Sequence, residues 1–211
     1  RNELPDFVLA CGRFLSDAQD QGMVADYVGT SPRLTLPAPV YFVDSTSQVF
    51  IDKSQQKNHT EVKLSSQVIF LGSHGLKEIQ GLTVGFLSGT YEEEAFKSAW
   101  GSDPFVYSNY TVHATRAVRR EAARQRRRVD ILLTSEWPDC EWSQQEKKLL
   151  APLADPRHVS PAVRKLYFAL RPRYLVCTGK RYCYRKAQPQ GPGGSFIGNF
   201  LGLAQASADI D

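Results

Sequence analysis

Several features are scarce in this sequence of 211 residues. No stretch approaches the ~18 consecutive apolar residues of a membrane-spanning helix, so we expect no membrane partner. There are only four cysteines, and no two of them form a Cys-x-x-Cys pair, which favours a reducing intracellular compartment. Cys11 and Cys177 lie inside apolar runs and are predicted to be small buried hydrophobic residues.

Motifs of the common catalytic classes are missing as well. The sequence contains no Gly-x-Ser-x-Gly turn, no P-loop and no His-Glu-x-x-His helix. Of its four histidines, only His74, which follows a predicted strand, is a candidate metal ligand, and an exposed turn histidine is the simpler interpretation. No histidine is near Cys177 in the sequence, so a structural thiol is favoured there over a nucleophile.

The composition that remains is that of a globular protein. Hydrophobic residues make up 42% and charged residues 23% of the chain, a balance that argues against disorder. The length fits one domain, placed at residues 1–204, with a patternless tail at 205–211 that is expected to fray. Proline and glycine predict linkers at 30–39 and 187–194, and a polar loop is predicted at 55–60.

The hydrophobic pattern predicts an α/β fold. Short apolar runs between turn residues indicate strands that are covered on both faces, and two more polar or Gly-interrupted segments suit an edge or antiparallel strand. The runs are Phe7–Cys11, Val40–Val43, Val68–Leu71, Leu82–Leu87, Val129–Leu133 and Tyr174–Cys177, and the two segments are Arg181–Arg185 and Ser195–Ala204. Helices are predicted over Ser16–Tyr27, Ser108–Arg127, Ser143–Leu150 and Ser160–Leu170, the last with Ser160 as N-cap and Pro161 at N1. This order predicts a sandwich in which a mixed sheet is flanked by helices.

The positive charge is concentrated in one segment. The net charge is +4, yet 116–128 holds seven arginines and one glutamate, or +6, so the rest of the chain sums to 4 − 6 = −2. On a helix, Arg116, Arg120, Arg124 and Arg127 would form one stripe, which Arg119, Arg126 and Arg128 would widen. Such crowding is unfavourable in isolation, and phosphates would relieve it. RNA is the favoured partner; an acidic protein surface and a solvated helix face remain as alternatives.

A second basic cluster interleaves cations with aromatic residues. It comprises Lys180, Arg181, Tyr182, Tyr184, Arg185 and Lys186. Tyrosine and arginine together can stack on bases and neutralise phosphates, which makes the cluster a second candidate for RNA or partner binding. Alternation of Tyr182 and Tyr184 also fits an ordinary strand with one face on the core.

Four segments in their order resemble one protein family. They are Phe7–Phe14, Phe86–Thr90, the strand end Val129–Pro138 with Leu-Leu-Thr-Ser-Glu-Trp-Pro, and Arg171–Tyr174. This set resembles the N-terminal domain of the CwfJ family of splicing-associated proteins, which are related to calcineurin-like metallophosphoesterases. The resemblance covers about 7 to 204 and is weak over 16–66 and 91–128. It implies a metallophosphoesterase-type sandwich, here without the first strand and its motif.

The resemblance also implies that the metal site is degenerate. A binuclear phosphoesterase centre holds two cations ~3.5–4 Å apart with carboxylate, imidazole and amide ligands from several strand ends. At the matching positions stand Arg13, Asp44, Ser135 and Lys180. We therefore expect no metal, no cofactor and no catalytic residues.

The predicted function is a non-catalytic, nuclear, splicing-associated module. The resemblance implies spliceosomal proteins and the lariat-debranching enzyme as partners, with intron-lariat RNA as a further ligand. One alternative is a residual metal-dependent phosphodiesterase with a reduced site at His74 and Asp44. Another is a structural subunit of a different ribonucleoprotein, whose arginine helix touches RNA without sequence preference.

Overall fold

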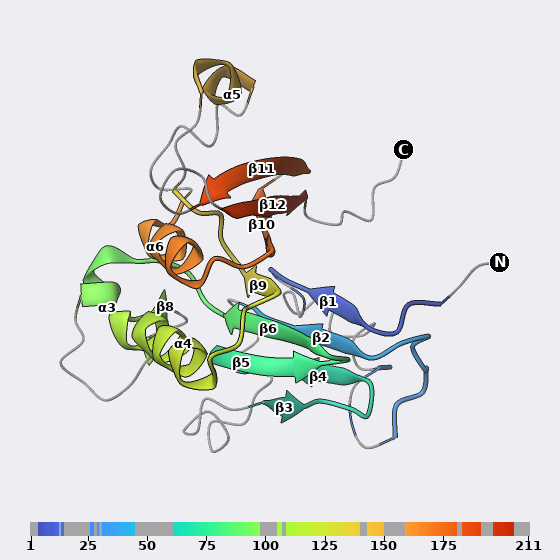
Figure 1. Ribbon diagram of the computed structural model, residues 1–211. Helices are drawn as coiled ribbons and strands as arrows, with labels where there is room; N and C mark the ends of the chain where they lie inside the picture. The colour runs from blue at the N-terminus through green and yellow to red at the C-terminus, as the bar shows by residue number, and fades with distance from the viewer. Residues whose placement is uncertain are drawn as a thin grey trace.

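The computed structural model describes most of the chain in separate stretches. They are residues 4–12, 14, 26–27, 29, 31–44, 61–97, 105–106, 109–139, 143–149, 159–180, 183–190 and 196–204. These residues form two mixed β-sheets that pack face to face, with helices on the outer face of the larger sheet (Figure 1). The predicted α/β class is confirmed.

The smaller sheet has four strands in the order β1-β2-β4-β3. They are β1 (Val8–Ala10), β2 (Val40–Phe42), β3 (Val62–Lys63) and β4 (Val68–Phe70). The first three in spatial order run parallel, and β3 pairs antiparallel with β4.

The larger sheet has six strands in the order β11-β12-β10-β9-β6-β5. They are β5 (His74–Ile79), β6 (Leu82–Leu87), β9 (Ile131–Thr134), β10 (Tyr174–Lys180), β11 (Tyr184–Gln190) and β12 (Phe196–Ala204). The four central strands are parallel, whereas β5 and β11 run antiparallel at the two edges. A separate short pair joins β7 (Phe105–Val106) and β8 (Asn109–Tyr110).

The described helices are α3 (Glu93–Lys97), α4 (Val112–Gln125), α5 (Gln144–Leu149) and α6 (Pro161–Leu170). α4 and α6 pack on the larger sheet through Ala114, Val118, Val163 and Leu166. Each of these two helices leads into the next parallel strand, so both end at the edge of the sheet where β9 and β10 begin. That edge, the amino edge, faces away from the carboxyl edge at which the parallel strands end.

Burial on both faces explains the continuous apolar runs. Successive strand residues point to opposite faces, so Leu132 packs toward the helices and Leu133 packs toward the smaller sheet. Both are fully buried. The predicted two-sided cover is therefore confirmed for β9, whereas β1 is only partly covered, with Val8 exposed.

Several predicted boundaries hold and others move. β6 has the predicted bounds, and Ser160 caps α6 because its Oγ accepts the Val163 N–H at 3.1 Å. The predicted linker at 187–194 is wrong over 187–190, because these residues belong to β11. Pro189 is tolerated there since β11 is an edge strand, on which one row of N–H groups needs no partner. The predicted helix over 16–27 is wrong at 26–27, which form a turn, and 16–25 lie outside the described residues, as does the predicted loop at 55–60.

Candidate nucleic-acid interface

α4 presents the arginines because its other face is apolar. Ala114 and Val118 are buried against the sheet, whereas all seven arginines of 116–128 are exposed. The helix ends at Gln125, and Arg126 follows in the left-handed conformation with φ 53°. The predicted stripe is therefore wrong at Arg127, which lies beyond the helix.

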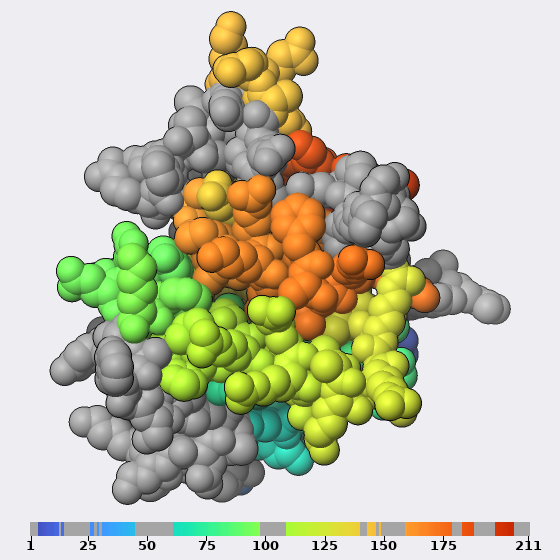
Figure 2. All heavy atoms as spheres, turned by 60° about the vertical axis from the view of Figure 1, so that its left-hand side comes forward, coloured from blue at the N-terminus to red at the C-terminus, as the bar shows by residue number. Residues whose placement is uncertain are grey.

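A groove runs along the arginine face, between α4, the end of α6 and the residues that lead into β9. Its volume is about 700 Å³, and its charged lining consists of Arg116, Arg119, Arg120 and Arg127. The remaining lining residues are small or aliphatic: Ala122, Ala123, Val129, Ala169 and Leu170. In Figure 2, α4 (lime) and α6 (orange) run side by side across the face turned to the viewer. We call this feature the arginine groove.

The arginines of the segment differ in their local charge balance. Arg124 donates to Glu121 at 2.7 and 3.0 Å, and Arg127 pairs with Glu78 of β5. Glu121 holds the pKa of Arg124 above its ordinary value, and Arg124 in turn lowers the pKa of Glu121. By contrast, Arg116, Arg119 and Arg120 form no ion pair with any residue that the structure describes. The uncompensated charge is thus concentrated in the arginine groove.

Two arginines outside the predicted set join this surface at the amino edge. β9 and β10 pair in parallel, so the segment before β10 lies beside the segment before β9. The Arg173 N–H donates to the Val129 carbonyl at 3.4 Å, and Arg171 is exposed two residues earlier. The Arg171-Pro-Arg-Tyr174 sequence before a predicted strand is the signal that could have placed them here.

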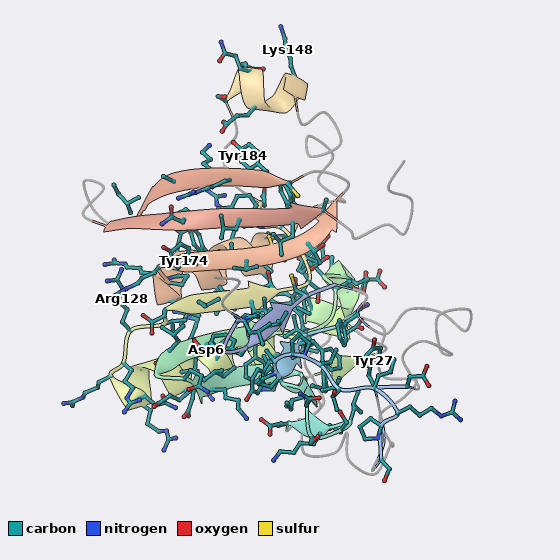
Figure 3. All side chains as sticks on the ribbon, turned by 90° about the vertical axis from the view of Figure 1, so that its right-hand side faces the viewer. Asp6, Tyr27, Arg128, Lys148, Tyr174 and Tyr184 are labelled. Atoms are coloured by element: carbon teal, nitrogen blue, oxygen red, sulfur yellow. The ribbon has the colours of Figure 1, made fainter. Side chains whose placement is uncertain are left out.

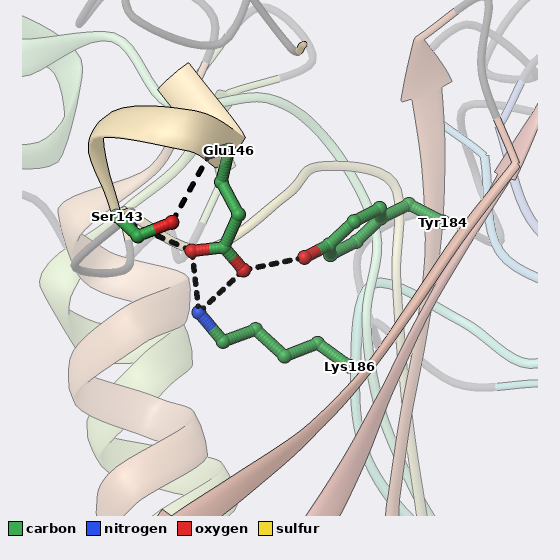
Figure 4. Close-up of polar contacts among 4 residues, drawn as sticks. All are labelled: Ser143, Glu146, Tyr184 and Lys186. Atoms are coloured by element: carbon green, nitrogen blue, oxygen red, sulfur yellow. Dashed lines mark hydrogen bonds and ion pairs between the residues drawn. The ribbon is translucent and has the colours of Figure 1, made fainter. Parts of the chain in front are cut away.

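The second basic cluster does not form a cationic patch in the described residues. The Lys186 ammonium binds the Glu146 carboxylate of α5 at 2.8 Å, and the Tyr184 hydroxyl donates to the same group at 2.6 Å (Figure 4). Tyr184 also packs on Trp137 and Phe200, with ring centroids 6.1 and 6.0 Å away. These contacts favour the ordinary strand interpretation of Tyr184, and RNA binding by Lys186 stays a prediction.

The other members of the second basic cluster add little evidence for RNA or partner binding. Arg185 is exposed on the opposite face of β11 from Tyr184. Arg181 and Tyr182 lie outside the described residues, and only the backbone of Lys180 is described, at the end of β10. The described members of this cluster lie at the carboxyl edge, where β10 ends and β11 begins, and so lie away from the arginine-rich amino edge.

The carboxyl edge gathers most of the predicted former metal positions. Asp44 follows β2 and its carbonyl accepts the Gly89 N–H beyond β6 at 3.2 Å, while Ser135 follows β9. A Cβ on Gly12, which has φ +99°, would lie 2.4 Å from Cγ2 of Thr178, so the end of β1 touches the end of β10. The strand ends of the two sheets therefore meet at one place. Arg13 lies outside the described residues.

The donors at this edge do not fit a binuclear metal centre. Asp44 supplies one carboxylate, whose Oδ2 already accepts the Phe14 N–H at 2.9 Å. His74 Nδ1 lies 2.9 Å from Ser73 Oγ, and Ser135 supplies a buried hydroxyl that has no hydrogen-bond partner among the described residues. Across the described stretches, no three His, Cys, Asp or Glu side chains gather as metal ligands would. Two cations need several anionic or imidazole donors, which this set lacks.

In the described structure, the distinctive Thr134–Pro138 segment packs against and hydrogen-bonds to neighbouring elements. Glu136 Oε2 accepts the Tyr110 hydroxyl at 2.6 Å and the Tyr91 N–H at 2.7 Å. Since Tyr110 donates to Glu136, Ser160 Oγ donates to Tyr110 across 2.6 Å. Burial, and then the nearby Glu136 carboxylate, raises the pKa of Tyr110 well above its ordinary value. Trp137 is fully buried against Phe200 of β12.

Comparison with known proteins identifies no family. No protein-family model matches the chain, and no curated protein matches it. Among solved structures, the chain is similar to one titled "GAP50 the anchor in the inner membrane complex of Plasmodium", at 9% identity and a TM-score of 0.44. The match covers 94% of this chain and 61% of that one, so the chain spans about 61% of that structure's length. No described helix is long and apolar enough to cross a membrane.

Proposed function

We propose that this chain is a non-catalytic, RNA-binding module of the splicing machinery, with the fold of the CwfJ-type metallophosphoesterase-like domain. The fold proposal is supported by the parallel strands of the two sheets, whose carboxyl ends meet at one edge. Metallophosphoesterases bind their metals at such an edge. The non-catalytic proposal is supported by the side chains of Asp44, Ser135 and Thr178. These three offer one carboxylate and two hydroxyls where a binuclear centre needs several carboxylate and imidazole ligands. The resemblance adds spliceosomal proteins, the lariat-debranching enzyme and a nuclear location to the proposal.

The arginine groove is the observation that carries RNA binding. Guanidinium groups hold phosphate oxygens with paired N–H donors, and each bound phosphate releases counterions. Four arginines line one groove, and three of these have no carboxylate partner among the described residues. None of the described residues that line it is acidic, so an approaching phosphate meets arginines, of which Arg127 is paired with Glu78, and small aliphatic groups.

The experiment compares two sets of arginines on the same segment. The triple variant Arg116→Gln, Arg119→Gln, Arg120→Gln removes the uncompensated cations, whereas Arg124→Gln with Arg127→Gln removes arginines that already face Glu121 and Glu78. The triple variant should weaken binding of a fluorescent oligoribonucleotide evenly across sequences. It should also reduce the log–log salt slope by up to ~0.7 for each phosphate of the single strand that the protein no longer binds. The double variant should change the slope less.

Two outcomes would contradict RNA binding by this groove. One is a wild-type protein with no salt-dependent affinity for RNA, whose triple variant loses a co-purifying acidic protein instead. The other is a triple variant that keeps every partner and its full salt slope, which would make the segment a solvated face. Purification of the tagged wild-type protein with identification of its bound proteins and RNAs tests the splicing assignment separately.

A further inference from the structure

We propose that the amino edge of the six-stranded sheet extends the arginine groove into a binding path for single-stranded RNA, which ends on a base-stacking platform at Tyr174. This inference rests on the proposed function, since it specifies which form of RNA the groove binds. The path passes from the groove over Arg126 and Arg128, then over Arg171 and Arg173, to the tyrosine. Arg128 and Tyr174 lie at the same edge in Figure 3.

The first support is the charge that the fold brings to this edge. Arg126 and Arg128 follow α4, while Arg171 and Arg173 follow α6, and the β9–β10 pairing places the two connections together. All four are exposed. The Asp130 carboxylate faces one of them, with its Oδ1 3.5 Å from Arg173 Nε. The edge therefore continues the positive surface of the groove.

The second support is the backbone conformation of two of these arginines. Both helices end on an arginine in the left-handed region, Arg126 at φ 53° and Arg171 at φ 49°. Their N–H groups close the helices on the carbonyls of Ala122 and Tyr167. Glycine is the residue that adopts this conformation without steric cost, and it usually occupies such positions. The backbone conformation at these two helix C-termini would thus favour glycine. The presence of arginine at both positions indicates that the guanidinium group has a role of its own.

The third support is the position of the aromatic ring. The described lining of the arginine groove has no aromatic residue, so the groove offers phosphate contacts but no aromatic ring on which a base can stack. Tyr174 is 41% exposed at the start of β10, and it points to the face opposite Leu175, which packs toward the helices. A ligand that touches both the groove and Tyr174 must turn across the edge of the sheet. A single strand can make this turn with its bases unstacked, whereas a stiff duplex cannot.

The test uses three probes of equal length: an oligoadenylate, its duplex with oligouridylate, and an abasic oligoribose phosphate. Wild-type protein should bind the oligoadenylate most tightly. Tyr174→Ala should weaken oligoadenylate binding about 5- to 100-fold, the range expected when a single base no longer stacks. It should leave abasic binding and the salt slope unchanged, and Tyr174→Phe should bind as wild type does. Leu203→Ala, at an exposed apolar residue on the same face at the carboxyl edge, is the matched control and should bind normally.

The arginine part of the path has its own variants. Arg126→Gly with Arg171→Gly should weaken all three probes and lower the salt slope without loss of folding, because glycine suits both backbone positions. Gln80→Gly, at the turn residue with φ 48° before β6, relieves the same backbone conformation at the same edge of the sheet but removes no cation, so it should leave binding unchanged.

The outcomes separate this inference from the proposed function. If the groove triple variant loses RNA while Tyr174→Ala binds normally, the stacking platform is wrong and the RNA-binding groove stands. Equal affinity for duplex and single strand would likewise overturn the path alone. Absence of binding to all three probes by the wild-type protein would overturn both.

Discussion

At the scale of single residues, the surroundings decide what an arginine does. Arg124 and Arg127 face carboxylates, Arg173 lies near Asp130, and Arg119 faces no described acid. An exposed ion pair contributes little to stability, yet it lowers the charge that a phosphate meets. A count of arginines in the sequence therefore overstates the charge available for a ligand, and only the structure separates the paired from the unpaired.

Burial should make Cys11 unreactive. It is partly buried against the inter-sheet core, and loss of solvation raises its pKa to about 12. At pH 8 only about one Cys11 in ten thousand is the reactive thiolate, whereas Cys183 is exposed. Site-resolved mass spectrometry after iodoacetamide treatment should find Cys183 alkylated and Cys11 unmodified until the protein is unfolded in urea. Equal rates for the two in the native protein would place Cys11 outside the core.

Truncation of a core strand should cost far more than removal of a charge. Leu132 and Leu133 are fully buried on opposite faces of β9, so replacing either by alanine should lower the free energy of unfolding by about 2–5 kcal/mol. Arg127→Ala removes an exposed side chain and should cost less than about 0.5 kcal/mol. Denaturant melts that show equal losses would contradict the two-sided burial of β9.

At the scale of elements, short helices depend on side-chain contacts for their position. α5 has only six residues, too few to be stable alone. Ser143 and Glu146 form a reciprocal cap, since the Ser143 Oγ accepts the Glu146 N–H at 3.2 Å and the carboxylate accepts the Ser143 N–H at 2.7 Å. The same carboxylate binds Lys186 and Tyr184 of β11 (Figure 4). One glutamate thus caps the helix and attaches it to the sheet.

This attachment should weaken in acid. The Lys186 ammonium, followed by the Tyr184 hydroxyl, lowers the pKa of Glu146 from 4.5 to about 2. A carboxylate with a lowered pKa stabilises the native state above its unfolded value, and the contribution disappears as the pH falls from about 4.5 to about 2. Glu146→Gln should therefore reduce the free energy of unfolding at pH 7 but hardly change it near pH 2. Lys186→Met should follow the same profile in urea melts, and a pH-independent difference would contradict the pair.

The two left-handed helix ends should be more stable with glycine. The left-handed conformation costs a non-glycine residue about 1–2 kcal/mol, whereas an exposed arginine near a helix C-terminus contributes about 0.3–1 kcal/mol through the helix dipole. Arg126→Gly and Arg171→Gly should thus each raise the free energy of unfolding by about 0.5–1 kcal/mol. Thermal melts measure this, with Gln80→Gly as the control for backbone relief without a helix end. A destabilised Arg171→Gly would mean that its side chain supports the fold.

The sequence predicted the elements whose signals are local. β6 is a continuous apolar run between turn residues, and α6 begins with a Ser-Pro cap, so both were predictable in place. β5 was not, because an edge strand carries polar residues, as at Lys77 and Glu78, and β11 was predicted only at its start, because its later residues include Pro189 and resemble a linker. The candidate site divides in the same way. The arginines of 116–128 stand together in the chain, but the Glu146–Lys186 pair spans 40 residues. No local pattern reveals such a contact.

At the scale of the whole molecule, the two edges of the larger sheet have different chemistry. The amino edge collects arginines from the ends of α4 and α6, while the described former metal positions at the carboxyl edge carry the Asp44 carboxylate and the Ser135 hydroxyl. Crossover helices that lead into parallel strands necessarily end at the amino edge, so the topology itself carries the basic residues away from the strand ends. RNA bound along the basic face would therefore not pass over Asp44 and Ser135.

That separation gives a final prediction about metal. Among the described residues, the former metal positions at the carboxyl edge supply one carboxylate, held by the Phe14 N–H, and hydroxyl groups, and two cations require more anionic or imidazole ligands than these. We expect purified protein to turn over no chromogenic phosphodiester in added manganese. We also expect no manganese-dependent rise in Tm. If manganese did bind the native state, a free concentration 100 times its Kd would raise the free energy of unfolding by about 2.7 kcal/mol. His74→Ala and Asp44→Asn test the two remaining donors separately. Manganese-dependent turnover, or a manganese-induced rise in Tm, that either variant abolishes would show that the edge retains a working metal site and that the protein is a phosphodiesterase.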